Sequence, residues 1–390
     1  MIVQLINLSS LNIFREYHDR YGISTSGYTY GLYGLELRDL TLREAESIYN
    51  LLSSRGEKIF LREISIGSVN LFLVGSLRKF KFICERISNN LSISLSSKLL
   101  NTIKRFENYD LTNYNIGNKH FEFNKVYVAG ILNVTPDSFS DGGKYFNRSK
   151  AVRHAFKMLD EGADIIDIGG ESSRPGARSV DAKIEIERII PVIKKILEKR
   201  PDTIISVDTT KEIVAKKALE SGAKIINDIS GGTFEPGILK VAAKYKAVFI
   251  IMHMKGTPEN MQTEPFYENV VEEVYDFLYE QIKKATDAGI AHIIVDPGIG
   301  FGKTEEHNFK LIQRLDDFKS LSYPIMIGVS RKSFIGKSLN LKVSERDIPS
   351  SLMESLSVSK GARIIRTHNV KLGGMLRELF NTTYNGSPND

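Results

Sequence analysis

The sequence has no tryptophan and a single cysteine, Cys84, among its 390 residues. One cysteine cannot form an intrachain disulfide or a metal site built from several thiolates. Its apolar neighbours Phe82 and Ile83 indicate a small buried side chain rather than a nucleophile. Without tryptophan, the chain also offers few aromatic platforms for stacking sugar rings, which disfavours a glycosidase.

Long apolar runs and runs of basic residues are also missing. No apolar stretch approaches the ~20 residues that a membrane helix needs. The first residues, M-I-V-Q-L-I-N-L-S-S, carry no basic group ahead of the apolar ones, unlike a signal peptide. No Lys/Arg run is suited to a phosphate backbone, while a net charge of +6 suits small anionic substrates. We therefore expect a cytoplasmic protein that binds neither membrane nor nucleic acid.

Residues 1–120 are predicted to form a small α/β (α+β) domain. Thr41 and Glu44 have the spacing of a capping box ahead of a helix. Strands are expected at 58–66 and 69–74, joined at Gly67-Ser68, and helices at 77–91 and 99–106. No catalytic motif occurs here, so oligomerisation, regulation or a cover over the second domain all remain open.

Residues 121–381 alternate short Val/Ile-rich runs with amphipathic helical segments. This alternation predicts a parallel sheet with right-handed crossovers. Eight such units match the length of a (β/α)₈ TIM barrel, typically about 250 residues. The alternative, an open doubly wound sheet, is expected to place its chemistry at one switch point. Residues 382–390 are expected to be a flexible tail. The predicted strands are 126–133, 164–170, 203–208, 224–229, 247–253, 291–296, 324–330 and 362–368.

Polar residues close every one of these predicted strands. A terminal Asp or Asn can be a simple helix cap. Eight polar ends that meet at the carboxyl rim of one barrel instead indicate an active site. The rim comprises Asn133, Glu171, Asp208, Asn227, His253, Asp296, Arg331-Lys332 and Arg366/His368.

Asp208, Asn227 and Asp296 form a recessed set of hydrogen-bond acceptors with one amide donor. Such a set suits a heterocycle with an amidine-like edge of N–H groups. A metal, or paired carboxylates as in glycoside hydrolysis, remains an alternative at this point. His253 has no His or Cys partner at ligand spacing, so a structural zinc is not expected.

Two anion sites are predicted after the last two strands, where TIM barrels often bind phosphate. In I-G-V-S-R-K-S, Ser330 and Ser333 are candidate helix caps, and Arg331 and Lys332 supply positive charge. Arg366 and His368 provide the second site, followed by Asn369 as the expected N-cap of the last helix.

Three loops complete the mouth. In G-I-L-N-V-T-P-D-S-F-S-D-G-G-K, residues 130–144, Asn133 is a fixed strand end, and residues 135–143 are predicted to be a lid ordered by ligands. The others read G-G-E-S-S-R-P-G-A, residues 169–177, and D-P-G-I-G-F-G-K, residues 296–303. The latter lacks Walker spacing, so it is weak as a phosphate loop.

These motifs, with S-V-D-T, I-N-D, G-V-S-R-K-S and R-T-H-N-V, occur in an order that resembles the dihydropteroate synthases. The resemblance covers residues 121–381. It implies a transferase that condenses 6-hydroxymethyl-7,8-dihydropterin pyrophosphate with para-aminobenzoate, giving dihydropteroate and pyrophosphate in folate synthesis. Members of this family are commonly homodimers.

The resemblance also implies a role for each site residue. Asn133, Lys332, Arg366 and Asp208 are the implied catalytic residues, and Asn133 is the implied ligand of Mg²⁺. The pterin would contact Asp208, Asn227, Asp296, Lys332 and Arg366. The pyrophosphate would contact Asn133, Arg366 and His368, and para-aminobenzoate would contact Phe139, Ser173, Arg174, Pro175 and Ser333.

Three residues and the extra 120-residue segment depart from the family pattern. Ser173 stands where Thr is common, Asn369 where Asp is expected, and Ser350 where Gly is expected. The Asn369 departure predicts a weaker orientation of His368. A synthase for a related aryl amine, a pterin-binding methyltransferase and a non-enzymatic binding protein therefore remain alternatives. The loops of residues 130–144 and 327–333 argue against the methyltransferase.

Overall fold

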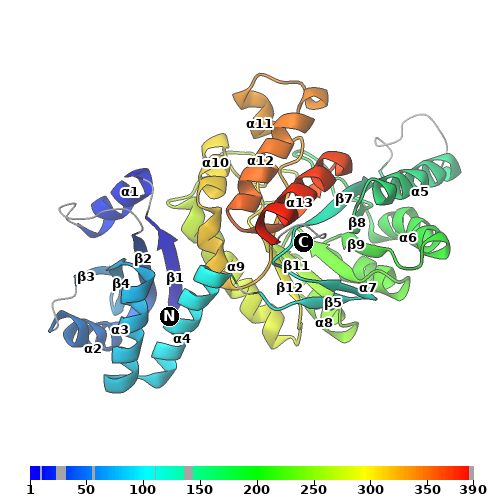
Figure 1. Cartoon of the computed structure of the whole chain (residues 1–390). Coiled ribbons are helices and arrows are strands. Elements are labelled where there is room, and N and C mark those ends of the chain that lie inside the picture. Colours follow the sequence, from blue (N-terminus) through cyan, green and yellow to red (C-terminus); the bar gives the residue numbers. More distant parts are fainter. Residues whose placement is uncertain (9–10, 23–31, 55–57, 110, 136–143, 386–390) are drawn as a thin grey trace. The chain divides into compact units, whose positions relative to one another are not determined.

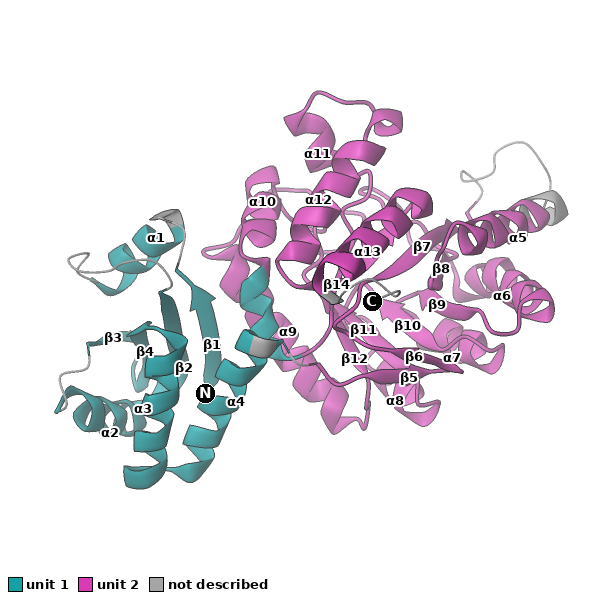
Figure 2. Ribbon diagram, viewed as in Figure 1, with its two compact units in different colours: residues 1–110, 316–322 teal, residues 111–315, 323–390 magenta. Residues whose placement is uncertain are grey.

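A computed structural model describes residues 1–8, 11–22, 32–54, 58–109, 111–135 and 144–385. The chain divides into two compact units (Figure 2). The first contains residues 1–110 with 316–322, and the second contains residues 111–315 with 323–390.

The first unit is an antiparallel sheet with helices on both faces (Figure 1). The strand order is β1-β2-β4-β3, with β1 Ile2–Asn7, β2 Tyr33–Thr41, β3 Ile59–Ser65 and β4 Ser68–Gly75. The helices are α1 Leu11–Tyr21, α2 Leu42–Ser53, α3 Leu77–Asn90 and α4 Ile93–Asn108, and most of η2 Leu315–Leu321 belongs to this unit.

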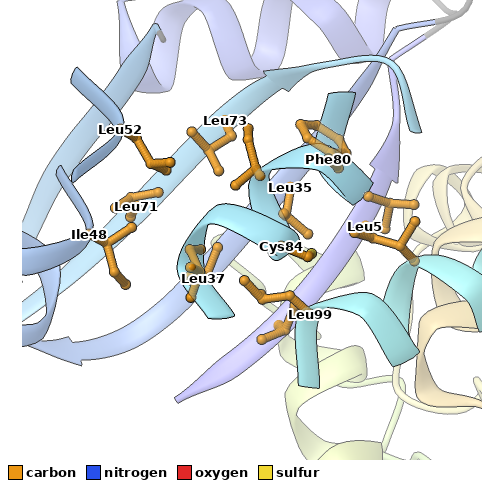
Figure 3. Packing of buried hydrophobic residues seen from close by; sticks show 14 of the residues in the cluster. Leu5, Leu35, Leu37, Ile48, Leu52, Leu71, Leu73, Phe80, Cys84 and Leu99 are labelled. Atoms are coloured by element: carbon orange, nitrogen blue, oxygen red, sulfur yellow. The ribbon is translucent and has the colours of Figure 1, made fainter. Parts of the chain in front are cut away.

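Two apolar clusters hold this unit together. Helices α2, α3 and α4 cover one face of the sheet, where Leu71, Phe80 and Cys84 belong to the larger cluster (Figure 3). Helix α1 covers the other face, with Tyr17 stacked on Phe72. Burial raises the pKa of the Cys84 thiol to about 12, so the predicted inert cysteine is confirmed.

The predicted features of this segment are largely confirmed, and three elements were not predicted. The Thr41 side chain accepts from the Glu44 amide, and the Glu44 carboxylate accepts from the Thr41 amide, completing the capping box. The hairpin at Gly67-Ser68 joins β3 to β4. Strand β1 was missed because it is buried on both faces, which removes the polar alternation of a half-exposed strand. Helix α1 and strand β2 were missed as well.

The second unit contains a closed barrel of eight parallel strands, so the predicted TIM barrel is confirmed. Strand β14 pairs with β7, with Arg366 opposite Ala129, and this closure excludes the open sheet. The strands are β7 Tyr127–Asn133, β8 Ile165–Gly169, β9 Ile204–Asp208, β10 Ile225–Asp228, β11 Val248–Met252, β12 Ile293–Asp296, β13 Ile325–Ile327 and β14 Ala362–Thr367.

Helices surround this barrel (Figure 1). They are α5 Lys144–Asp160, α6 Ala182–Lys199, α7 Glu212–Glu220, α8 Gly237–Lys244, α9 Val270–Asp287, α10 Glu305–Gln313, α11 Ser333–Ser338, α12 Asp347–Ser359 and α13 Val370–Asn385, with the short η3 Val343–Glu345. In the described part of the chain, no helix is both long and apolar enough to cross a bilayer.

A short hairpin that the sequence did not predict belongs to the barrel unit. It consists of β5 Tyr114–Ile116 and β6 Lys119–Phe121. The Tyr114 hydroxyl donates to the carbonyl of Ile293, 2.7 Å away, at the start of β12. The hairpin therefore contacts the amino end of a barrel strand, opposite the rim that carries the predicted site.

This hairpin indicates where the chain can be cut without removing part of the barrel unit. We propose that residues 111–390 fold without the preceding segment. A fragment that starts at residue 122 loses the buried side chains of Tyr114, Ile116 and Phe121, and should unfold at a lower temperature than one that starts at residue 111. Thermal unfolding by circular dichroism compares the two. An insoluble 111–390 fragment would show that the cut divides a shared core.

Candidate active site

Most of the predicted rim residues line a cavity, or a recess beside it, at the carboxyl ends of the barrel strands. Its volume is about 700 Å³. Of the predicted site residues, its wall contains Asn133, Ser173, Arg174, Pro175, Lys332, Ser333, Arg366 and His368. A narrower recess shares Lys332 and Arg366 with the cavity and adds Asn227 and Asp296. Asp208 lines neither space but is bonded to Arg366, whereas Glu171 and His253 lie outside both.

Arg366 forms ion pairs with two carboxylates in the barrel interior, those of Asp167 and Asp208. Its Nε donates to Asp167 Oδ2 at 2.6 Å, and its Nη2 donates to Asp208 Oδ2 at 2.7 Å. Burial raises the pKa of Asp208 to about 7 although Arg366 opposes the shift, and the two carboxylates raise the pKa of Arg366. The guanidinium is therefore a fixed cation at the floor of the cavity.

Asp167 is a site residue that sequence reasoning missed. It lies inside β8, with its side chain 2% exposed. The signal was present, because an aspartate within the apolar strand I-I-D-I-G requires a partner in the barrel interior. Asn227 Nδ2 also donates to Asp167, at 3.1 Å.

Buried oxygens without hydrogen-bond partners lie beside this ion pair. Among the described residues, Asp167 Oδ1 and Asn227 Oδ1 have none. Asp296 Oδ1 accepts from the Gly298 amide at 2.7 Å, and burial raises the pKa of Asp296 to about 6. Unsatisfied buried acceptors are costly, so this recess suits a ligand that brings N–H donors. That agrees with the predicted heterocycle.

Lys332 places a second cation at the recess. Its Nζ lies 3.9 Å from the centre of the Phe301 ring. Burial, followed by the nearby Arg366, lowers the pKa of Lys332 to about 8, which leaves the ammonium mostly charged at neutral pH. Phe301 lines both cavities and was not selected from the sequence, although it lies within the quoted 296–303 motif.

The 296–303 loop is held by a buried lysine. Lys303 Nζ donates to the carbonyls of Gly298 and Phe301, at 2.9 and 3.0 Å, and lies 2.8 Å from His253 Nδ1. Gly298 has φ +68°, and a Cβ there would lie 1.8 Å from the His253 carbonyl oxygen, so no side chain fits. His253 therefore belongs to the support of this loop. The described residues contain no cluster of three metal-binding His, Cys, Asp or Glu side chains.

Ser350 and Asn369, the two residues near the last strands that depart from the expected pattern, belong to one hydrogen-bond network. Arg331 adopts φ +58°, and its amide donates to Ser350 Oγ at 2.9 Å. Its guanidinium binds Asp347 through two bonds of 2.6 and 3.0 Å. Asn369 Nδ2 donates to the same carboxylate at 3.1 Å. An aspartate at 369 would instead place a second negative charge against Asp347.

Ser330 supports His368, and Asn369 caps the last helix. The Leu372 amide donates to Asn369 Oδ1, which confirms the predicted N-cap. The prediction that Ser330 or Ser333 caps α11 was wrong, because its N-cap is Lys332 and no side chain caps it. Ser330 Oγ accepts from the His368 amide at 3.1 Å and lies 3.0 Å from His368 Nδ1. Burial and neighbouring arginines lower the pKa of His368 to about 3, so the imidazole is neutral.

The 169–177 loop forms another wall of the cavity. Ser173 is half-buried, whereas Arg174 and Pro175 are exposed. The turn after them is fixed by the Gly176 amide, which donates to the Pro258 carbonyl at 2.8 Å. Phe139 lies outside the described residues, as does the predicted lid at 135–143 apart from Thr135.

A second charged cluster adjoins Asp208, and two of its members, Lys211 and Glu185, were not selected from the sequence. Lys211 Nζ donates to Glu171 and, at 2.8 Å, to the buried Glu185. Burial opposes the charge of Lys211, but the two carboxylates raise its pKa. These bonds explain why the rim residue Glu171 turns toward helix α7 and is held there.

The geometry can be compared with known proteins. The model of the pterin-binding enzyme family matches residues 129–368. Dihydropteroate synthase from Synechocystis sp. is 46% identical over 260 residues, covering 66% of this chain and 90% of that protein. The Escherichia coli K12 enzyme is 47% identical over 247 residues, covering 63% and 87%.

Solved structures give the same result. The Yersinia pestis dihydropteroate synthase, solved with a sulfonamide drug complex, has a TM-score of 0.66 at 39% identity, covering 70% of this chain and 100% of that one. The Xanthomonas albilineans dihydropteroate synthase with 4-aminobenzoic acid has a TM-score of 0.66 at 35% identity, covering 71% and 100%.

Proposed function

Because the chain belongs to the dihydropteroate synthases within the family of pterin-binding enzymes, we propose that the cavity at its barrel rim performs their condensation. The substrates would be 6-hydroxymethyl-7,8-dihydropterin pyrophosphate and para-aminobenzoate, and the products 7,8-dihydropteroate and pyrophosphate. The observation that carries this proposal is the recess lined by Asn227, Lys332 and Arg366. Two buried acceptors there and beside it, Asn227 Oδ1 and Asp167 Oδ1, have no partner among the described residues.

The pterin would occupy that recess. Its N–H edge matches the acceptor oxygens of Asp208, Asn227 and Asp296, and its ring would lie between Lys332 and Arg366. Asp167 would also face the ligand, because one of its oxygens still lacks a partner within the described residues. Carboxylates in a buried recess also favour a pterin that gains positive charge during the reaction.

The pyrophosphate would lie in the wider cavity, against Arg366, His368 and Asn133. Mg²⁺ prefers oxygen ligands and commonly binds through a few protein oxygens together with substrate phosphates and water. Asn133 offers a side-chain amide oxygen, while Asp167 and Asp208 already bind Arg366. The residues therefore fit a magnesium ion that Asn133 would hold together with the pyrophosphate. Bound there, it would neutralise charge on the leaving group.

The reaction needs no strong nucleophile from the protein. The bond between the methylene carbon and the pyrophosphate oxygen breaks, and its electron pair leaves with the pyrophosphate. The lone pair of the aryl amine then forms the new C–N bond, and that nitrogen releases a proton. Arg366 and the neutral His368 would hold the leaving group, while Asp208 and Asp296 stabilise the cationic pterin.

The aryl amine would enter beside the 169–177 loop. Ser173, Arg174, Pro175 and Ser333 line that side of the cavity, and Arg174 offers a cation for the carboxylate of para-aminobenzoate. Phe139 is proposed as a further contact. Ser350 and Asn369 bind Arg331 and Asp347. We propose that they support the wall of the site without selecting the acceptor.

The acceptor assay tests this function directly. With Mg²⁺, pterin pyrophosphate and para-aminobenzoate, the purified protein should release pyrophosphate and form dihydropteroate, measured by a coupled phosphate assay and chromatography. Omitting the amine is the control. If pyrophosphate were released only with another aryl amine, that amine would be the acceptor. If no tested amine led to pyrophosphate release, the proposed synthase activity would be wrong.

We also propose that the protein is a homodimer through helices α12 and α13. Ile348, Leu352 and Leu356 recur every four residues on α12 and are 68%, 63% and 53% exposed. Met375 and Leu379 extend this apolar face on α13. A second copy would bury it. Sedimentation velocity should show a dimer for the wild type and a monomer for Leu352→Glu, and a wild-type monomer would contradict the proposal.

A further inference from the structure

The connection between β8 and α6, residues 170–181, is closed at its base by Glu171. The Glu171 carboxylate accepts from the Val180 amide at 3.1 Å and from the Ser179 hydroxyl at 3.4 Å. These bonds join the first residues of the connection to its last ones. The residues proposed to receive the aryl amine lie between these two ends, so their position depends on how firmly Glu171 is held.

Glu171 is itself held by Lys211, the residue that precedes helix α7. The Lys211 ammonium donates to the same oxygen of Glu171, Oε2, and at 2.8 Å to Oε2 of Glu185. Glu185 lies in the first turn of α6 and is fully buried. These three side chains, here named the clasp, therefore tie the connection to two helices of the barrel.

The residue before Glu171 is fixed on α6 by other contacts. Arg188 Nη1, on α6, donates to the Gly170 carbonyl at 2.7 Å. A Cβ at position 170 would lie 2.8 Å from both Glu185 Cγ and Ile189 Cγ2, so the backbone passes too close to α6 for a side chain. The amino end of the connection is thus packed on the helix, whereas its carboxyl end is held through Glu171.

The clasp lies beside both halves of the candidate active site. A narrow recess is lined by its three residues together with Ser173 and Asp208. Ser173 belongs to the wall proposed for the aryl amine, and Asp208 is bonded to Arg366 next to the proposed pterin recess. A shift of the clasp would therefore be transmitted first to the acceptor side of the cavity.

Stability alone does not explain a charged clasp. Glu185 Oε1 has no hydrogen-bond partner among the described residues, and burial raises the pKa of this carboxyl although Lys211 opposes the shift. Apolar side chains of similar volume often stabilise a fold as well as a buried ion pair does. Apolar side chains would not, however, hold the Glu171 carboxylate in one place.

We propose that Lys211 and Glu185 are positioning residues that hold Glu171, and through it the carboxyl end of the connection, so that Ser173 and Arg174 are in place before the aryl amine binds. Without the clasp the connection would be closed only part of the time, and the amine would bind only that fraction. The inference rests on the proposed function, which assigns the ligand at this wall. Opening of the connection is measured without substrate, so the two can fail separately.

Two variants of the full chain break the clasp from different sides. In the double variant Lys211→Met/Glu185→Leu, apolar side chains replace the buried charges, which should preserve the fold. Glu171→Ala removes the link to the carboxyl end of the connection and leaves the ion pair between Lys211 and Glu185. Lys211→Arg keeps a cation between the two carboxylates. Circular dichroism confirms that each variant is folded.

Lys217→Met is the matched control. This lysine also belongs to the α7 segment, but it forms an exposed ion pair with Glu220 at 2.9 Å, within the same helix. Its loss should leave the connection and both substrate affinities as in the wild type.

Trypsin cleavage after Arg178, identified by mass spectrometry, reports opening of the connection in the protein without substrate. Arg178 is exposed, and the next residue, Ser179, is bonded to Glu171. Cleavage should be about tenfold faster in both clasp variants, because a hydrogen bond to a charged group is lost. Lys211→Arg and Lys217→Met should stay within about threefold of the wild type. An unchanged rate in both clasp variants would overturn the proposal.

Steady-state kinetics and calorimetry give the functional readout. In both clasp variants the KM for para-aminobenzoate should rise about tenfold, as expected if about a tenth of the molecules have the connection closed. The affinity for the pterin pyrophosphate should stay within about twofold, and Lys211→Arg should restore the KM for the amine. An unchanged KM for the amine, or an equal loss of affinity for both substrates, would overturn the positioning role.

Failure of the wild type to release pyrophosphate with any aryl amine would instead count against the proposed function. The trypsin experiment would then still decide whether the clasp holds the connection.

Discussion

Arg366→Met should abolish the condensation and also destabilise the protein, lowering its free energy of unfolding by about 3 kcal/mol. The loss of activity follows from the removal of a cation that would contact both the pterin and the pyrophosphate. The loss of stability has a separate cause. Asp167 and Asp208 are 2% and 10% exposed in their side chains, and both lose their charged partner. Steady-state kinetics and urea denaturation measure the two effects.

Arg363→Met is the control for this experiment. Arg363 lies on the same strand and donates to the Phe123 carbonyl at 2.9 Å, away from the cavity. Its removal should lower stability while leaving kcat unchanged. If Arg366→Met kept the wild-type kcat, or if it unfolded at the wild-type urea concentration, the ion pairs would not have the proposed role.

Lys332→Met should reduce the affinity for the pterin substrate at least about a hundredfold, because a charged hydrogen bond and a cation next to the ring are lost together. The variant should not be less stable than the wild type. Methionine keeps the apolar contact with Phe301. The lysine ammonium is desolvated in the folded state, so its removal costs the fold little. Binding is measured by calorimetry and stability by urea denaturation.

The pH dependence gives a second test of the same variant. Burial lowers the pKa of Lys332 to about 8, below its ordinary value of 10.5. Below pH 8 the charged lysine therefore lowers the free energy of unfolding by its full amount. This penalty fades as the pH rises from about 8 toward 10.5. Lys332→Met should be the more stable protein at neutral pH, and this advantage should shrink above pH 8.

The exposed Lys337→Met, on the same helix, provides the comparison. It should bind the pterin with wild-type affinity. A Lys332→Met protein with wild-type pterin affinity would remove Lys332 from the recess.

The barrel was predictable because its signals are local. Each Val/Ile-rich run has the composition of a strand buried on both faces, and the apolar residues of each amphipathic helix recur with the helical period. The alternation of the two patterns can therefore be recognised without knowing which strands pair. The strand ends were predictable for a related reason. Parallel strands place all their carboxyl ends at one rim, so polar residues there converge whatever their distance in the sequence.

Other parts depend on contacts between distant residues. The sequence contained Asp167, but its pairing with Arg366 joins positions 199 residues apart. Lys211 reaches Glu185 across 26 residues, and Tyr114 reaches Ile293 across 179. Strand β13 ends at Ile327 rather than at the predicted residue 330, and the chain turns back at Arg331 with φ +58°.

By itself, the sequence determined the eightfold repeat, the rim that carries the chemistry and the acceptor residues expected in a recess for a heterocycle. These follow from periodicity and from residue types at strand ends. Only the tertiary structure decided which of these groups are paired and which oxygens remain free. Hydrogen bonds and buried charges depend on distances within a few tenths of an ångström, which only the folded chain specifies.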